Sequence, residues 1–196
     1  MIPEKYQPIW DKAQEKLKQG RPDDLTHAEK VVKTILEYRG NLPIDQDILI
    51  PVAIMHDIGH CMILPKYFKY VSGGEKLKNG KLTHMLVGAK IAKDILQEVG
   101  YDEEKSKEII EIIALHDADL LEEKRPEFYN TENKRIFHDF DCLDRYNKER
   151  IDVYVKSGLF KTKKELLKIL AEKVEDLFTE EIKAQVKKQL KELQAE

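Results

Sequence analysis

The chain has 196 residues, of which 41% are hydrophobic and 36% are charged, and its formal net charge is -3. This length can bury a substantial core, and a charged fraction above the usual ~25% indicates a highly ionic surface. The small net charge offers no polybasic field, which argues against general binding to nucleic acids or to membrane surfaces. We therefore expect the partner to be a small molecule.

The sequence is expected to carry no signal for export or for membrane insertion. No apolar run approaches the ~20 residues that a spanning helix needs, and the N-terminus MIPEKYQPIW lacks the charged and apolar regions of a signal peptide. These features predict a cytoplasmic protein. Cys61 and Cys142 are too few for a disulfide framework or a cysteine-rich zinc site, so both are expected to be packing residues.

Apolar residues recur at helical spacing along nearly the whole chain, and no segment alternates with the period of a half-buried strand. The sequence thus predicts an all-α protein. We expect a helix over 4–19 that Gly20 ends, a second over 25–38, and a third that 43–47 introduces. Pro51 lacks a backbone donor, so it either takes the first helical position of that third helix or kinks it.

The segment 63–81 breaks the periodicity with Pro65 and with Gly73, Gly74 and Gly80, and is predicted to be a long loop. Further helices are expected over 82–99, 102–121 and 131–150, followed by two C-terminal helices with apolar stripes. Asp102 is an expected N-cap, and TKKE at 162–165 has the pattern of a capping box.

The C-terminal stripes are formed by Leu166, Leu170, Val174 and Leu177, and by Ile182, Val186, Leu190 and Leu193. We expect residues 1–160 to form the main helical domain. The helices of 161–196 would then pack on the same core or on a second subunit, so that a homodimer is possible.

Several histidines lie at helical core positions. His27 shares a helix face with Val31 and Ile35, and by the same spacing His84 and His116 are also predicted to point inward. In HDIGH, His56 and His60 are four residues apart and are predicted to stack on one helix face, with Asp57 about 100° round the helix from His56. Asp141 and Asp144 lie three apart on their own predicted helix.

A single histidine on an apolar face is more often a hydrogen-bonded core residue than a ligand. Burying all of these groups without partners would cost several kcal/mol per charge, and a divalent metal would remove that cost. Neutral imidazole and carboxylate groups are usual ligands of Zn²⁺, Mn²⁺ and Fe. A helical two-histidine zinc peptidase needs Glu after the first His, whereas this chain has Asp57 there. The motif therefore disfavours a zinc peptidase.

The order His27, then the pair His56 and Asp57, then Asp141 in DFDCLDRY resembles the HD-domain metal-dependent phosphohydrolase superfamily, over roughly residues 22–150. His84 and His116 resemble the extra ligands of its two-metal branches, such as the diadenosine tetraphosphatase-like and cyclic dinucleotide phosphodiesterase groups. The resemblance implies an HD-domain helical bundle with a C-terminal helical extension. The implied reaction is hydrolysis of a nucleotide-like or other small phosphate ester or anhydride.

The resemblance also implies one or two divalent metals, chosen among Mn, Fe, Co, Ni and Zn, with Mg possible. The first metal would take His27, His56, Asp57 and Asp141, and the second would take Asp57, His84 and His116. Asp57 would thus bridge the two ions and help to activate water. Asp117 and Asp144 would orient ligands, although Asp117 could also coordinate.

Two residues are implied to act on the substrate. His60 stands where several branches have Lys, and it could contact phosphate, donate a proton or support a ligand. Arg145 either binds the substrate phosphate or forms a surface salt bridge. His138 is given no role. The predicted loop carries five lysines, Lys66, Lys69, Lys76, Lys78 and Lys81. Together with Tyr67, Phe68 and Tyr70 they could cover a bound nucleotide, or they could simply be solvated.

The sequence departs from the cyclic dinucleotide group, because the paired histidine and the Gly-Tyr-Pro signature of that group are missing near LHDADLL. Asp117 stands in the place of the paired histidine. That substrate is therefore disfavoured. The alternative to an enzyme is a metal-stabilised module that senses or binds a nucleotide without turnover.

Overall fold

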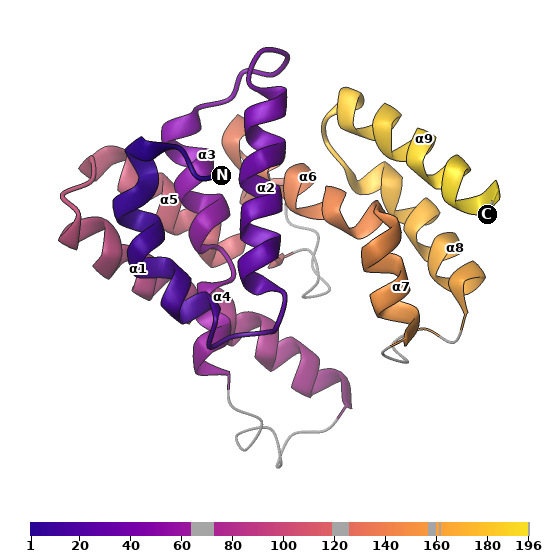
Figure 1. The fold of residues 1–196 in the computed structure, drawn as a ribbon, viewed down its shortest axis with the longest axis horizontal. Coiled ribbons are helices and arrows are strands. Elements are labelled where there is room, and N and C mark those ends of the chain that lie inside the picture. The colour runs from indigo at the N-terminus through magenta and orange to yellow at the C-terminus, as the bar shows by residue number, and fades with distance from the viewer. Residues whose placement is uncertain (64–72, 119–125, 157–159, 161, 196) are drawn as a thin grey trace. The chain divides into compact units, whose positions relative to one another are not determined.

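The computed structural model describes residues 1–63, 73–118, 126–156, 160 and 162–195. These residues form α-helices and short 3₁₀ helices, with no strand among them, which confirms the predicted all-α fold class (Figure 1). In the described part of the chain, no helix combines the length and the apolar character needed to cross a membrane. The chain divides into two compact units, Met1–Lys134 and Arg135–Glu196.

The first unit is a bundle built around one apolar helix. Its elements are η1 (Glu4–Tyr6), α1 (Gln7–Leu17), α2 (Asp24–Tyr38), α3 (Gln46–Met55), η2 (Ile58–Met62), α4 (Gly73–Glu98), α5 (Glu103–Leu115) and a 3₁₀ helix at Pro126–Tyr129. Helix α3 packs against α2 and α5, while α4 packs against α5 and η2. Every segment that carries a predicted histidine of this unit therefore borders the same interior.

Helix α3 is the centre of this bundle, since every residue from Ile48 to Met55 is buried. A helix that is apolar all round must be covered on all sides. Pro51 lies inside the helix and cannot donate to the carbonyl of Asp47 four residues earlier. The Tyr101 hydroxyl donates to that carbonyl at 2.7 Å instead, so the proline leaves no unsatisfied acceptor there.

A polar network fixes the start of α3. The Asp47 carboxylate accepts hydrogen bonds from Lys5 Nζ, from the Tyr6 hydroxyl at 2.7 Å, and from Lys105 Nζ at 3.1 Å. Asp45 caps the helix by accepting from the Asp47 backbone N–H. The network therefore joins the N-terminal segment and α5 to the first turn of the core helix.

The HDIGH segment is not one continuous helix, so the prediction that His56 and His60 stack on a single helix face is wrong. Helix α3 ends at Met55 with His56 as its C-cap, and η2 begins at Ile58. The physical reason is a close approach to α4 at Gly59. A Cβ added there would lie 2.0 Å from the His84 carbonyl oxygen and 2.7 Å from the Gly88 nitrogen.

Two expected element boundaries are also wrong. Helix α4 begins at Gly73, so 73–81 is helical rather than loop, while 64–72 lies outside the described residues. Each interior glycine costs a helix about 1 kcal/mol, which packing against α5 and η2 can offset. Helix α5 ends at Leu115 rather than near 121; its N-cap Asp102 accepts from the Lys105 N–H at 2.8 Å, as predicted.

The second unit contains most of α6 (Glu132–Leu143), followed by η6 (Asp144–Tyr146), α7 (Lys148–Lys156), α8 (Lys163–Lys173), η7 (Val174–Asp176) and α9 (Glu180–Ala195). The single helix expected over 131–150 is thus interrupted. Asn147 causes the break, because its side chain donates to the Asp144 carbonyl and accepts from the Arg150 N–H at 2.7 Å. Such local bonds compete with helix continuation and start a new helix.

Both C-terminal stripes are buried as predicted, and Thr162 caps α8 by accepting from the Glu165 N–H at 3.1 Å. Asp139, which is fully buried, accepts from the N–H groups of Phe178 and Thr179 just before α9. Helix α6 therefore holds the start of the last helix within this unit. The domain boundary expected near residue 160 stays a prediction.

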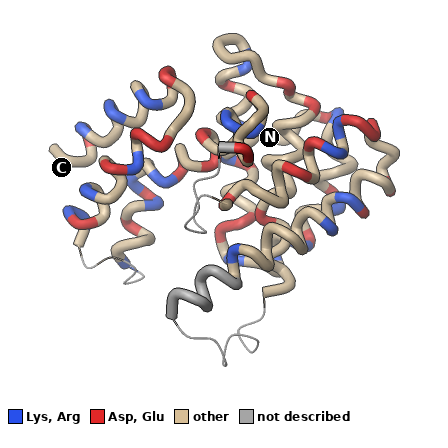
Figure 2. The backbone as a smooth tube through the Cα atoms, turned by 180° about the vertical axis from the view of Figure 1, so that it is seen from behind, with Lys and Arg blue, Asp and Glu red and all other residues tan. Residues whose placement is uncertain are grey.

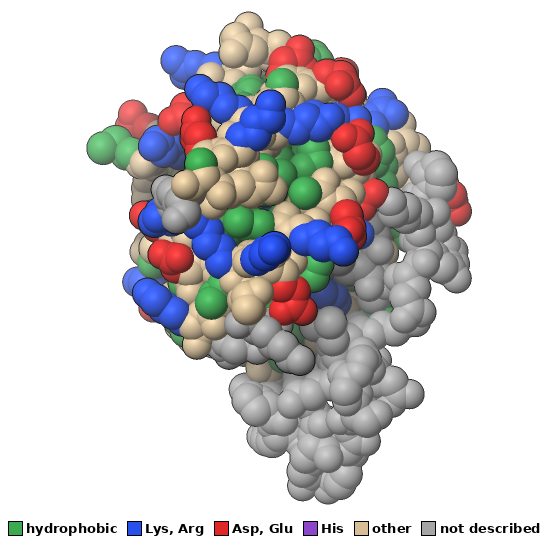
Figure 3. All heavy atoms as spheres, turned by 90° about the vertical axis from the view of Figure 1, so that its right-hand side faces the viewer, with side chains coloured by type: hydrophobic (Ala, Val, Ile, Leu, Met, Phe, Trp, Pro, Cys, Tyr) green, Lys and Arg blue, Asp and Glu red, His purple; other side chains and the backbone are tan. Residues whose placement is uncertain are grey.

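The described surface is highly ionic, as the composition indicates. Figure 2 shows basic and acidic residues interspersed along the helices. On the face drawn in Figure 3, basic and acidic side chains stand among small hydrophobic patches. Exposed pairs such as Lys90 with Asp94 contribute only about 0.3–0.5 kcal/mol each, so stability rests mainly on the buried helix faces.

Candidate metal centre

Five of the six histidines of the chain lie in the first unit and form a chain of ring contacts. They are supplied by α2, the end of α3, η2, α4 and the end of α5. Neighbouring ring centroids lie 5.1 Å apart for His27 and His56, 5.2 Å for His56 and His116, 5.0 Å for His84 and His116, and 4.2 Å for His60 and His84. All but the partly exposed His60 are buried.

Main-chain carbonyls set the tautomer of three of these rings. The Nδ1 atoms of His56, His84 and His116 lie 3.1, 3.3 and 2.8 Å from the carbonyl oxygens of Ala53, Gly80 and Ile113. Because a carbonyl only accepts, each Nδ1 must carry the hydrogen. In the neutral ring, Nε2 is then an unprotonated nitrogen with an available lone pair.

These three Nε2 atoms converge on the carboxylate of Asp57. The Nε2 of His56 lies 3.4 Å from Oδ2, and those of His84 and His116 lie 3.7 and 3.8 Å from Oδ1. The Nε2 atoms of His84 and His116 are 3.1 Å apart. Lone pairs that face one another and an anion repel unless a positive charge lies among them, so the arrangement suits a bound cation.

Protons on all of the rings do not supply this positive charge, because at least His84 stays neutral. Burial, reinforced by His116 and His60, lowers the pKa of His84 to about 3, so this ring is neutral at pH 7. Burial would raise the pKa of Asp57, but His56 and Arg21 outweigh it and hold that pKa well below its usual value. An ionised carboxylate beside an imidazole that is neutral at pH 7 offers the kind of donor atoms that a divalent transition metal binds.

Two groups of potential ligand atoms in this unit are compact enough for an ion. Asp57, His84 and His116 offer atoms within 4.8 Å of one another, and so do Asp24, Asp57 and His60. The first group is the set that the resemblance implied for the second metal. Asp57 belongs to both groups, which places it at the junction of the centre.

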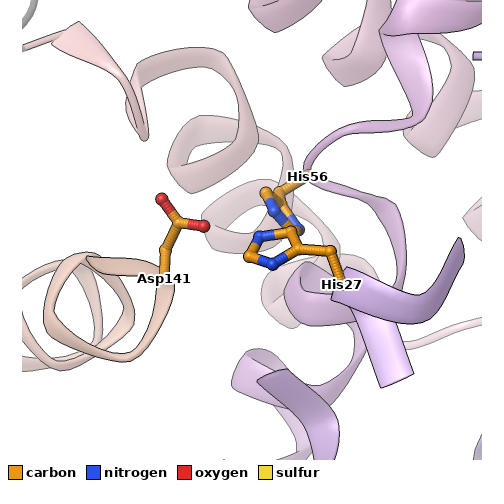
Figure 4. A group of neighbouring side chains, drawn as sticks. All are labelled: His27, His56 and Asp141. Atoms are coloured by element: carbon orange, nitrogen blue, oxygen red, sulfur yellow. The ribbon is translucent and has the colours of Figure 1, made fainter. Parts of the chain in front are cut away.

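The remaining predicted ligands are His27 and His56 in the first unit and Asp141 in the second. Figure 4 shows the rings of His27, from α2, and His56, at the end of α3, close to each other. Asp141 lies on α6 and is buried. Since the placement of the second unit relative to the first is not determined, the ligand set of these three residues stays a prediction.

Sequence reasoning missed Arg21 and Asp24. Arg21 Nε donates to Asp24 at 2.6 Å, and its Nη2 donates to Asp57. Asp24 is fully buried at the start of α2. Only the short spacing from Arg21 to Asp24 in RPDD was visible in the sequence, and the contact with Asp57 spans 36 positions.

His60 and Asp117 border the centre. His60 Nε2 is 3.2 Å from Asp57 Oδ1, and Asp117 lies 3.7 Å from His84 Nε2 while pairing with Lys81 at 3.2 Å. Asp117 was expected to orient His116, but that ring is oriented by a carbonyl. Of the lysines predicted to cover a nucleotide, only Lys81 has a described side chain. The described part of the chain leaves out the side chains of Lys76 and Lys78. It also leaves out the whole of Lys66, Tyr67, Phe68, Lys69 and Tyr70.

In the second unit, Arg145 Nη2 lies 3.3 Å from Asp141, so the guanidinium is paired with this predicted ligand. Asp144, expected to orient ligands, bonds the Asn147 side chain. His138 donates from Nδ1 to Asp139 at 3.0 Å and lies 3.7 Å from Cys142 Sγ. These contacts give His138 a structural role within the unit, consistent with its omission from the site.

The chain matches the HD domain family over residues 24–146, more than half of its length. It therefore belongs to the HD domain family. No curated protein and no solved structure matches it. The family match covers the helices that carry every predicted ligand, from His27 to Asp141, and the cluster of histidines and aspartates suits a divalent metal.

Proposed function

We propose that this protein is a metal-dependent phosphohydrolase that acts on a nucleotide-like or other small phosphate ester or anhydride. The observation that carries the proposal is the convergence of three Nε2 atoms on Asp57, since it creates a buried donor set in need of a divalent cation. Membership of the HD domain family supports the reaction class. His27 and Asp141 would complete the ligands of a first metal, and His84 and His116 would hold a second.

A divalent ion bound here would lower the pKa of a coordinated water to about 7 and would provide hydroxide at neutral pH. The protein's own residues would do the rest. The main-chain carbonyls behind His56, His84 and His116 hold their rings in one orientation, which fixes the ligand geometry. His60, only partly exposed beside Asp57, would contact the substrate or move a proton.

The test is a substrate screen on apo-protein reloaded separately with Mn²⁺, Fe²⁺, Co²⁺, Ni²⁺, Zn²⁺ and Mg²⁺. The panel contains phosphomonoesters, nucleotides, dinucleoside polyphosphates and cyclic dinucleotides, and product release is measured. We expect turnover with at least one metal and none after chelation. Metal binding without turnover on the whole panel would instead favour the sensing module, and failure to bind any metal would contradict both.

A further inference from the structure

Arg21 is a cation held against the metal centre by two carboxylates. Its Nε donates to Asp24 Oδ1 at 2.6 Å, and its Nη2 donates to Asp57 Oδ2. The side chains of Asp24 and Asp57 are 0% and 7% exposed, whereas that of Arg21 is 45% exposed. The guanidinium thus connects the buried carboxylates of the centre to solvent.

The position of this guanidinium coincides with a possible cation site. Asp24, Asp57 and His60 offer ligand atoms within 4.8 Å of one another, as a metal site would. Arg21 contacts both carboxylates of that group. The protein therefore supplies its own positive charge to this part of the centre.

The two oxygens of Asp57 face different partners. Oδ1 faces His60, His84 and His116, while Oδ2 faces Arg21 and His56. A divalent ion held by Asp57 would draw its charge away from the guanidinium and repel it. Metal binding and the ion pair of Arg21 with Asp57 must therefore weaken each other, by the reciprocity of linked equilibria.

We propose that Arg21 is a tethered cation that shares Asp57 with the metal and binds a phosphate group of the substrate through its exposed edge. The inference rests on the proposed function, because it names a residue that would recognise its substrate. A guanidinium has five N–H donors in a planar fork. Donors beyond those that hold Asp24 and Asp57 match the oxygens of a phosphate.

The test uses Mn²⁺ alone and then inorganic phosphate added to the Mn²⁺-loaded protein, both followed by calorimetry. The variants are Arg21→Met and Arg21→Lys, and the control is Arg39→Met, which removes one exposed arginine at the end of α2. We expect Arg21→Met to bind Mn²⁺ about fivefold tighter, or more, because the competing cation is gone. We expect its phosphate affinity to fall at least about tenfold.

Arg39→Met should stay within about twofold of the wild type in both measurements, since its charge is screened from the centre. Mn²⁺ and phosphate affinities of Arg21→Met equal to those of Arg39→Met would overturn the inference and leave the proposed function standing. A wild-type protein that binds neither Mn²⁺ nor any other metal of the substrate screen would overturn the proposed function itself.

Circular dichroism checks the fold of each variant. The Arg21 backbone N–H, which also donates to Asp24 at 2.7 Å, remains in every one of them. If Arg21→Met does not fold, Arg21→Lys decides alone. A lysine keeps the charge but lacks the fork that spans both carboxylates, so phosphate affinity should drop about threefold or more, and an unchanged affinity would overturn the inference.

Discussion

Asp57 is the residue on which the centre depends. It lies within 4 Å of His56, His60, His84 and His116 and forms an ion pair with Arg21. No other described residue belongs to two of the potential ligand groups of the first unit. Its loss would leave imidazole lone pairs facing one another without an anion to help hold a metal.

We therefore expect Asp57→Ala to abolish metal retention and hydrolysis together. Elemental analysis of the purified variant measures the first, and product release measures the second. Asp94→Ala is the matched control, because Asp94 is an exposed carboxylate on α4 that forms an ion pair with Lys90. Normal metal content and activity in Asp57→Ala would exclude the site described here.

A substitution of His84 can distinguish a site for one metal from a site for two. It belongs to the group of Asp57 and His116 but not to the proposed set of His27, His56 and Asp141. If two metals bind at saturation, His84→Ala should lower the metal content from two per chain to one. An unchanged content of one would favour a single metal, with His84 and His116 acting on substrate or on structure.

At the scale of elements, the contact between η2 and α4 decides the shape of the site. Gly59 and Gly88 face each other across it, with no room for a side chain at Gly59. This contact places His60 against His84 and turns the chain sharply after His56. The short turn η2, packed against α4, thus brings His60 next to His84, whereas a helix that continued after His56 would not.

Gly59→Ala should force η2 away from α4, because the new methyl carbon would fall 2.0 Å from a backbone oxygen. We expect a loss of about 1–3 kcal/mol in the free energy of unfolding and at least about a tenfold loss in metal affinity, as misplaced ligands bind weakly. Urea unfolding and calorimetry measure the two effects. Gly40→Ala is the control, since nothing lies within 4 Å of a Cβ at Gly40.

The network at the start of α3 predicts a pH dependence. Hydrogen bonds from Lys5 and Tyr6 hold the pKa of Asp47 below its ordinary value. The unfolded chain therefore takes up a proton at Asp47 near pH 4 that the folded chain does not. This carboxylate stabilises the fold above that pH, and its contribution shrinks as the pH falls toward the lower, folded-state pKa.

Asp47→Asn should lower the free energy of unfolding by about 1 kcal/mol at pH 7. The difference from the wild type should narrow progressively below about pH 4. Urea unfolding at a series of pH values measures it, with Asp94→Asn as the exposed control. A difference that stayed constant from pH 7 to pH 3 would show that charge on Asp47 does not contribute.

At the scale of the molecule, metal and stability should be linked. The buried donor groups of the first unit repel one another without a cation, so a metal bound here should favour the folded state over the unfolded one. At a free metal concentration of 100 times the dissociation constant, this stabilises the fold by about 2.7 kcal/mol. Chelation should lower the melting temperature of the wild type and leave that of Asp57→Ala unchanged.

The sequence by itself determined the fold class and most of the inward-facing polar residues. Helical spacing placed His27, His84 and His116 on buried faces, and all three are buried. The N-caps Asp102 and Thr162 and both C-terminal stripes were also correctly predicted. These features depend on neighbours within a few positions of the chain, which is why a single sequence suffices to find them.

Tertiary structure alone decided the break after His56, the pairing of His60 with His84, and the position of Arg21 beside Asp57. Each of them joins segments that are 24 or more positions apart, or results from such a contact. The spacing of residues along the chain does not predict the close approach of the Gly59 backbone to α4. It also does not predict that the Arg21 side chain reaches Asp57. The spacing of the histidines predicted a metal, but only the packed helices aim their nitrogens at one aspartate.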